Sequence, residues 1–150
     1  MSRARTQAGF IAGAEVFALG ILVFVLATLI AVNAWAVVDA KMALTDAVKE
    51  GVRTYVEETP DPSAEPDARQ AARKALEGHG RSASSLKLRR VNEEQGNARC
   101  APVTFEAAVD VPLIAIPLLP RHRAQFHVTA RHSELVDPLR TGIEGEAPCV

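Results

Sequence analysis

The sequence predicts an α+β protein in which a long N-terminal transmembrane helix continues into an amphipathic helix and ends in a small domain. That domain is expected to hold one further helix and an antiparallel sheet of about three strands. Residues 16–38 carry no charged side chain, and residues 39–58 repeat apolar residues every three or four positions without a proline. From Ser82 onwards, apolar and polar residues alternate instead. These periods are those of a spanning helix, a one-sided helix and half-buried strands.

The uncharged segment 16–38 begins directly after Glu15. At about 1.5 Å per residue it covers about 35 Å as a helix, enough to cross a hydrocarbon core of about 30 Å. A buried core helix is the alternative, but such helices rarely stay uncharged for so long. Arg3 and Arg5 are the charges before Phe10, whereas the charges after the segment nearly cancel. This bias predicts a single-pass protein of the cell (inner) membrane, with a cytoplasmic N-terminus and an extracytoplasmic C-terminal domain.

A cleaved signal peptide is a competing interpretation of the same segment. Residues 34–36, Ala-Trp-Ala, resemble a signal-peptidase site, which would leave Val37 as the first residue. The apolar stretch is longer than the usual apolar region of about 7–15 residues, however, and the helical pattern continues beyond the site.

The chain divides into four predicted parts: a basic leader (1–9), a transmembrane and amphipathic helix (10–58), a Pro-rich linker (59–67) and an extracytoplasmic α+β domain (68–150). The helix over 10–58 would be a rod of roughly 70 Å. The outer half of this helix has an apolar stripe along one face. That stripe must be buried, either against the chain's own domain or against neighbouring copies. That stripe contains Leu44, Ala47, Val48, Gly51, Val52 and Tyr55.

The domain is expected to open with a helix that begins near Pro66 and ends near Gly78 and Gly80, with an alanine-rich apolar stripe. Three alternating stretches then predict strands, which we expect to pair antiparallel with one face on the helices. The core-facing positions expected in them are Leu86 and Leu88, then Val103, Phe105, Ala107, Val109 and Val111, then Phe126, Val128 and Ala130.

An apolar connection, residues 112–120, joins the last two predicted strands. Its sequence, PLIAIPLLP, contains three prolines, which argue against a central strand. The segment is either a loop tucked over the edge of the core or an exposed apolar patch for a partner subunit or the membrane surface.

The two cysteines, Cys100 and Cys149, both lie in the part predicted to be outside the cytoplasm, where disulfides persist. A bond between them would close a loop of about fifty residues, worth about 4 kcal/mol in the chain-entropy model. Two free thiols are the alternative. A metal site is disfavoured, because the chain has no CxxC and its four histidines show no ligand spacing with either cysteine.

Composition and motifs argue against several functional classes. The formal net charge is −1, and no basic patch is interleaved with aromatic residues, so nucleic-acid binding is not expected. We find no catalytic constellation and no glycine-rich phosphate loop, so the sequence predicts a protein that is not an enzyme and needs no cofactor. Glu15 is the one acid in an apolar setting. It either lies at the cytoplasmic interface among headgroups or is neutralised by a partner, such as the N-terminal amine of a neighbouring subunit.

The order of residues at the N-terminus resembles that of a known protein family. A short basic leader ends in Gly9, Phe10 follows, and Glu15 precedes the long apolar helix. Residues 14–26, AEVFALGILVFVL, and the amphipathic continuation over 43–56 add to the pattern. This arrangement resembles type IV pilins and pseudopilins, and most closely the TadE-like minor pilins of tight-adherence pili.

The resemblance implies that a prepilin peptidase cuts after Gly9, so that Phe10 becomes the first residue and Glu15 helps the subunit enter the pilus. In the family pattern the Glu is the fifth residue after the cut, whereas Glu15 is the sixth. One helical residue turns the carboxylate by about 100°. Residues 132–137, HSELVD, and the late cysteine Cys149 also look similar to the end of such chains.

Three functions follow as hypotheses. The first is a structural minor pilin or pseudopilin-like subunit of a pilus or secretion assembly, with the lipid bilayer, other pilin or membrane subunits along 10–58 and a prepilin peptidase as partners. The second is a permanently membrane-anchored binding or accessory subunit. The third is a small secreted domain. The mature N-terminus separates them: Phe10 for the first, Met1 or Ser2 for the second, and Val37 for the third.

Overall fold

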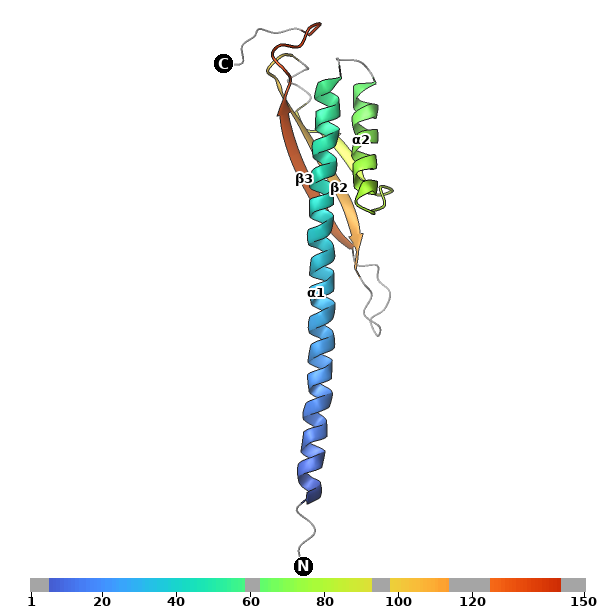
Figure 1. Cartoon of the computed structure of the whole chain (residues 1–150), viewed down its shortest axis with the longest axis vertical. Coiled ribbons are helices and arrows are strands. Elements are labelled where there is room, and N and C mark those ends of the chain that lie inside the picture. The colour runs from blue at the N-terminus through green and yellow to red at the C-terminus, as the bar shows by residue number, and fades with distance from the viewer. Residues whose placement is uncertain (1–5, 59–62, 93–97, 114–124, 144–150) are drawn as a thin grey trace, which may run out of the picture.

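A computed structural model describes residues 6–58, 63–92, 98–113 and 125–143, with side chains from Glu15 onwards. Its elements follow the order α1, α2, β1, β2, β3 along the chain. The small domain packs against the C-terminal half of α1, and the N-terminal half projects from it as a single rod (Figure 1). The predicted order of a long helix, a second helix and a three-stranded sheet is confirmed.

Helix α1 spans Thr6–Glu57 without a break. It begins four residues before the predicted start at Phe10, because residues 6–9 contain no proline and good helix formers such as Gln and Ala can extend the first turn. The residues predicted for its apolar stripe are buried, and the stripe begins already at Ala40. Buried apolar side chains on α1 are Ala40, Ala43, Leu44, Ala47, Val48, Val52 and Tyr55.

Helix α2 spans Ala64–Gly78 and begins inside the segment 59–67 that we predicted to be a linker. Pro66 lies in the first turn, where a backbone N–H has no partner within the helix, so the proline is tolerated there. Glu65 and Asp67 in the same turn favour a helix start, since negative charge interacts well with the helix N-terminus. The remaining linker residues, 59–62, lie outside the described residues.

The sheet has the order β1-β2-β3, with both pairs antiparallel. Strand β1 spans Lys87–Arg90, β2 spans Pro102–Pro112 and β3 spans Gln125–Leu135. The predicted alternation is confirmed along β2, where Val103, Phe105, Ala107, Val109 and Val111 are all buried. On β3 it holds for Val128 and Ala130 but not for Phe126, which is 46% exposed.

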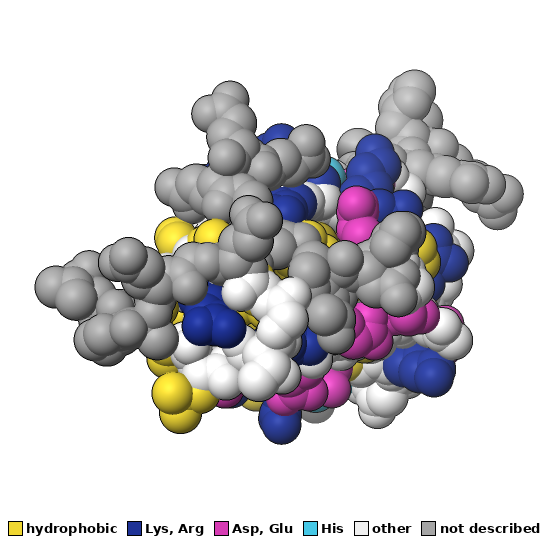
Figure 2. Space-filling model, turned by 90° about the horizontal axis from the view of Figure 1, so that it is seen from above, with side chains coloured by type: hydrophobic (Ala, Val, Ile, Leu, Met, Phe, Trp, Pro, Cys, Tyr) yellow, Lys and Arg dark blue, Asp and Glu magenta, His cyan; other side chains and the backbone are white. Residues whose placement is uncertain are grey.

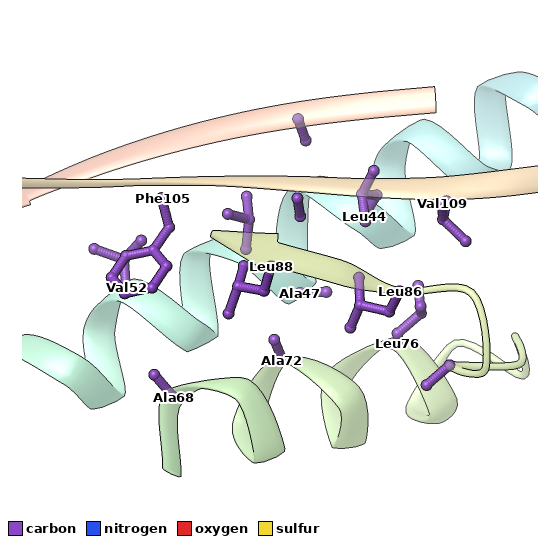
Figure 3. Packing of buried hydrophobic residues seen from close by; sticks show 14 of the residues in the cluster. Leu44, Ala47, Val52, Ala68, Ala72, Leu76, Leu86, Leu88, Phe105 and Val109 are labelled. Carbon is purple, nitrogen blue, oxygen red and sulfur yellow. The ribbon is translucent and has the colours of Figure 1, made fainter. Parts of the chain in front are cut away.

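The core lies between one face of the sheet and the two helices. Figure 3 shows Ala68, Ala72 and Leu76 of α2 below Leu86 and Leu88, with Phe105 reaching from β2 towards Val52 of α1. Because α2 offers alanines along most of its inner face, the two helices pack closely. The predicted loop over 112–120 is described only as far as Leu113, and the end of the C-terminal tail, 144–150, lies outside the described residues.

Gly51 marks the closest approach of the two helices. A Cβ atom at this position would lie 3.1 Å from the Ala68 carbonyl oxygen, 3.3 Å from the Ala72 Cβ and 3.4 Å from Leu88 Cδ2. Two of these contacts are backbone or Cβ atoms, which cannot swing away. Gly51 is therefore required by packing, although glycine weakens an exposed helix by about 1 kcal/mol relative to alanine.

We expect Gly51→Leu to lower the free energy of unfolding by about 3 kcal/mol, because overpacking forces α2 and β1 away from α1. Chemical denaturation of the detergent-solubilised protein measures this. Gly78→Leu is the matched control, since nothing lies within 4 Å of a Cβ built at Gly78. Equal stability of the two variants would contradict the packing assigned to Gly51.

Candidate functional site

The N-terminal half of α1 is the most distinctive surface of the molecule. From Glu15 to Asp39 most of its large apolar side chains are exposed, whereas Leu29 and Val37 are partly buried, and the segment Glu15–Glu57 contains a strongly apolar stretch with a mean hydropathy of 2.6. In length and composition this is one candidate membrane-spanning helix near the N-terminus. The exposed large side chains between Glu15 and Asp39 are Val16, Phe17, Leu19, Ile21, Leu22, Val23, Phe24, Val25, Leu26, Ile30, Val32, Trp35 and Val38.

The two polar side chains of the segment 16–38, Thr28 and Asn33, each donate a hydrogen bond to the helix itself. The Thr28 hydroxyl donates to the Phe24 carbonyl at 2.8 Å, and Asn33 Nδ2 donates to the Leu29 carbonyl at 2.8 Å. Such bonds matter in a hydrocarbon environment, where an unsatisfied polar group costs several kcal/mol. The two polar residues of the segment are therefore compatible with lipid.

Gly9, Phe10 and Glu15, the residues predicted for processing and assembly, all fall within α1. The Gly9–Phe10 peptide bond is thus helical rather than part of an extended leader, and the side chains of both residues lie outside the described part. Glu15 is exposed, and among the described residues its carboxylate has no hydrogen bond or ion pair. It is followed by more than twenty uncharged residues.

The end of the uncharged segment 16–38 is joined to the domain without a spacer. Arg81, from the loop after α2, donates through Nη2 to Asp39 Oδ2 at 2.6 Å and to the Ala36 carbonyl at 3.0 Å. Lys41 donates to the Thr129 carbonyl of β3. Ala40 is already 0% exposed, so the packed domain begins within one turn of Val38, where the uncharged segment 16–38 ends.

The opposite end of α1 is capped by a residue from the C-terminal tail. Arg140 Nη1 and Nη2 donate to the carbonyls of Val56 and Glu57. A helix leaves its last carbonyls without partners, and a cation there also interacts favourably with the helix dipole. Since α1 has no basic residue in its own last turn, this tertiary contact takes over that role.

Cys100 lies near the same outer end and is disulfide-bonded. Its backbone N–H donates to the Val136 carbonyl at 3.0 Å, and its φ of 64° is in the left-handed region. Cys149 lies outside the described residues, so the pairing of Cys100 with Cys149 stays a prediction.

Charged groups on the outer face of the sheet pair across the strands. Glu106 on β2 accepts from Arg89 on β1 at 2.9 Å and from Arg131 on β3. These two guanidinium groups, Arg131 before Arg89, hold the pKa of Glu106 below its usual range. His127 Nδ1 lies 2.8 Å from Asp110 Oδ1. The arrangement is a solvated, charge-paired surface.

An open groove of about 620 Å³ runs between α1 and α2. The residues that line it include four acids, Asp46, Glu50, Glu58 and Asp67, and one base, Lys74. In the described part of the chain, no group of three or more His, Cys, Asp or Glu side chains is placed to hold a metal ion. The outer end of the domain likewise shows Lys and Arg side chains beside Asp and Glu side chains (Figure 2).

The structure does not gather the predicted site residues into one place. Gly9, Phe10 and Glu15 lie at the N-terminal end of the rod, and Cys100 lies beyond its other end. Sequence reasoning missed Arg81 and Arg140, which join distant parts of the chain to α1. The residues around Arg81 and Arg140 in the sequence form no pattern from which their partners on α1 could be predicted.

Comparisons of this chain with family models, with curated proteins and with solved structures found no match. The class defined by the fold is that of a small α+β domain carried by one long helix whose first half could cross a membrane by length and composition.

Proposed function

We propose that this chain is a structural minor pilin or pseudopilin-like subunit of a tight-adherence or type IV-like pilus or secretion assembly. The observation that carries the proposal is the single helix α1, which exposes apolar side chains all round in its first half and forms the centre of a small domain in its second half. The resemblance to TadE-like minor pilins, which covers mainly residues 8–57, supports it.

The exposed half of α1 must be covered in the cell, since so large an apolar surface is strongly disfavoured in water. Lipid tails cover it while the subunit is held in the inner membrane, with its N-terminus in the cytoplasm. A bundle of α1 helices from neighbouring subunits would cover the same surface after assembly. A rod that is apolar on every side suits both environments, which is what a subunit that leaves the bilayer needs.

When α1 moves from the bilayer into a bundle of helices, the charge of Glu15 must be neutralised. In a bundle of apolar helices an unpaired carboxylate is costly, so it must meet a cation or take up a proton. No described residue of the same chain supplies that cation. The amine of Phe10, created by cutting after Gly9, on the same or an adjacent subunit, is the group that we propose for this role.

The proposal predicts that processing and assembly can be blocked separately, by changes at Gly9 and at Glu15. Gly9→Leu should block processing and leave the full-length chain in the membrane. Glu15→Ala should impair assembly but leave membrane insertion intact, since removing a charge eases insertion. Mass spectrometry of the chain from cells with and without the prepilin peptidase, together with isolation of assembled fibres, measures both.

Matched controls exist on the same helix. Gly20→Leu makes the change of Gly9→Leu at a glycine whose Cβ position meets nothing within 4 Å, and it should leave processing intact. Glu50→Ala removes an exposed carboxylate from the outer half of α1 and should leave assembly intact. Assembly lost equally in Glu15→Ala and Glu50→Ala would contradict the role given to Glu15.

A permanently membrane-anchored accessory subunit is the second candidate. It is favoured by the helical Gly9–Phe10 bond and by the place of Glu15 one residue beyond the family spacing. An unchanged full-length mass with and without the peptidase, together with normal partner binding by the Glu15→Ala protein, would select it. A mature chain that begins at Val37 would instead select the secreted domain.

A further inference from the structure

Phe126 lies where the core face of β3 continues beyond the core. Its neighbours on that face, Val128 and Ala130, are buried, and so is Val111, its partner on β2. Phe126 is nevertheless 46% exposed. A large aromatic side chain left open at the edge of a core either costs stability or has another apolar environment.

The contacts between β3 and α1 set the level of Phe126 along the rod. The two elements run side by side in the same direction (Figure 1), with Lys41 bonded to the Thr129 carbonyl at one end and Arg140 to the end of α1 at the other. Phe126 precedes Thr129 by three residues, about 10 Å along a strand. About 10 Å corresponds to roughly seven helical residues, which places Phe126 near the level of Trp35.

Trp35 is the only tryptophan of the chain and is 71% exposed. It lies on the last turns of the uncharged segment, just before Ala36, whose carbonyl accepts from Arg81. Tryptophan is enriched at the boundary between lipid tails and water, because its ring is apolar and its N–H is polar. Trp35, Phe126 and Arg81 therefore form one end of the domain, which we call the base.

We propose that the base of the domain lies in the headgroup layer of a lipid bilayer, so that the domain rests on the membrane instead of standing clear of it. This inference rests on the membrane-spanning part of the proposed function. Because the packed domain begins at Ala40 and Arg81 clamps Asp39, no spacer separates the base from the span. Insertion of the span therefore brings Trp35 and Phe126 to the same interface.

The charges at the base indicate which lipid surface it fits. Arg81 is paired with Asp39, and His127, next to Phe126, is paired with Asp110. Among the described residues, both of these ion pairs lie within the protein, and the base offers the two aromatic side chains Trp35 and Phe126 to a lipid surface. We therefore expect contact with a zwitterionic phosphatidylcholine surface, without a requirement for anionic lipid.

The single tryptophan makes the inference testable in the full-length protein. The protein is reconstituted into phosphatidylcholine vesicles that contain lipids brominated either near the headgroup or deep in the acyl chains, and tryptophan fluorescence is recorded. Trp35 should be quenched most by the shallow bromines. The double variant Trp35→Phe/Phe126→Trp should lose about as much fluorescence to the shallow bromines as Trp35 does.

Two further variants complete the design. Trp35→Phe/Leu139→Trp places the probe at the outer end of the domain, where Leu139 is 83% exposed, and it should not be quenched. Trp35→Phe/Gln125→Trp places the probe next to Phe126 in the sequence, at an exposed position. This variant can replace Trp35→Phe/Phe126→Trp if the latter fails to fold.

The outcomes separate the two proposals. Quenching of Trp35 without quenching of the probe at 126 or 125 would overturn the docking of the base and leave the membrane span intact. If neither the shallow nor the deep brominated lipid quenched Trp35, the N-terminal half of α1 would not cross the bilayer. The membrane step of the proposed function would then be wrong as well. Quenching at 125 or 126 that appears only in vesicles with anionic lipid would overturn the zwitterionic contact.

Discussion

Replacing Phe105 with alanine should lower the free energy of unfolding of the domain by about 4 kcal/mol, within the range measured for deep phenylalanine truncations. Phe105 is 0% exposed on the central strand β2, and its ring meets the Tyr55 ring of α1 edge to face with centroids 5.3 Å apart. The change removes this contact and leaves a cavity between the sheet and Val52. A small domain has about 5–15 kcal/mol of stability in total, so this loss would be a large fraction of it.

Urea unfolding of the detergent-solubilised protein, followed by Trp35 fluorescence and circular dichroism, measures this loss. Phe126→Ala is the matched control, because it makes the same truncation on an exposed side chain of the same sheet and should cost about 1 kcal/mol or less. If both truncations shifted the urea midpoint equally, the core would not be centred on Phe105.

The second large effect concerns the disulfide of Cys100. Cys149→Ser should lower the free energy of unfolding by about 4 kcal/mol, because the bond predicted between Cys100 and Cys149 restricts a loop of about fifty residues in the unfolded chain. We expect the outer end of the domain to unfold first. There Cys100 pairs its backbone with Val136, and Arg140 caps α1.

Non-additivity tests the pairing directly. Cys100→Ser, Cys149→Ser and the double variant should all lose the same stability, since each removes one bond, whereas two independent thiols would give summed effects. Thiol labelling of the unfolded wild-type protein should rise only after reduction. Equal labelling before and after reduction would contradict a disulfide between the two cysteines.

Local patterns in the sequence were sufficient for the elements and for much of the core. The uncharged run 16–38 predicted the exposed half of α1, and the three- and four-residue spacing over 39–58 predicted the face that packs in the domain. Alternation in residues 103–111 predicted the buried face of β2. These predictions succeed because burial on one side of a helix or strand imposes its period on neighbouring residues.

Element boundaries were less predictable. Three prolines predicted a linker over 59–67 with a helix start near Pro66, yet α2 begins two residues earlier, at Ala64, because proline is excluded from the interior of a helix but not from its first turn. The start of α1 at Thr6 depends in the same way on weak local preferences. Such preferences are small beside the energy of tertiary packing.

Contacts between residues far apart in the chain were decided only by the tertiary structure. Arg81 finds Asp39 and the Ala36 carbonyl, Arg140 finds the end of α1, and Gly51 meets Ala68 and Ala72 only because the two helices cross there. The exposure of Phe126, which alternation placed in the core, follows from its position at the start of β3, just outside the buried core. The sequence by itself determined which surfaces are apolar, because side-chain chemistry is local. The packing of the whole chain determined which of those surfaces meet each other and which stay exposed.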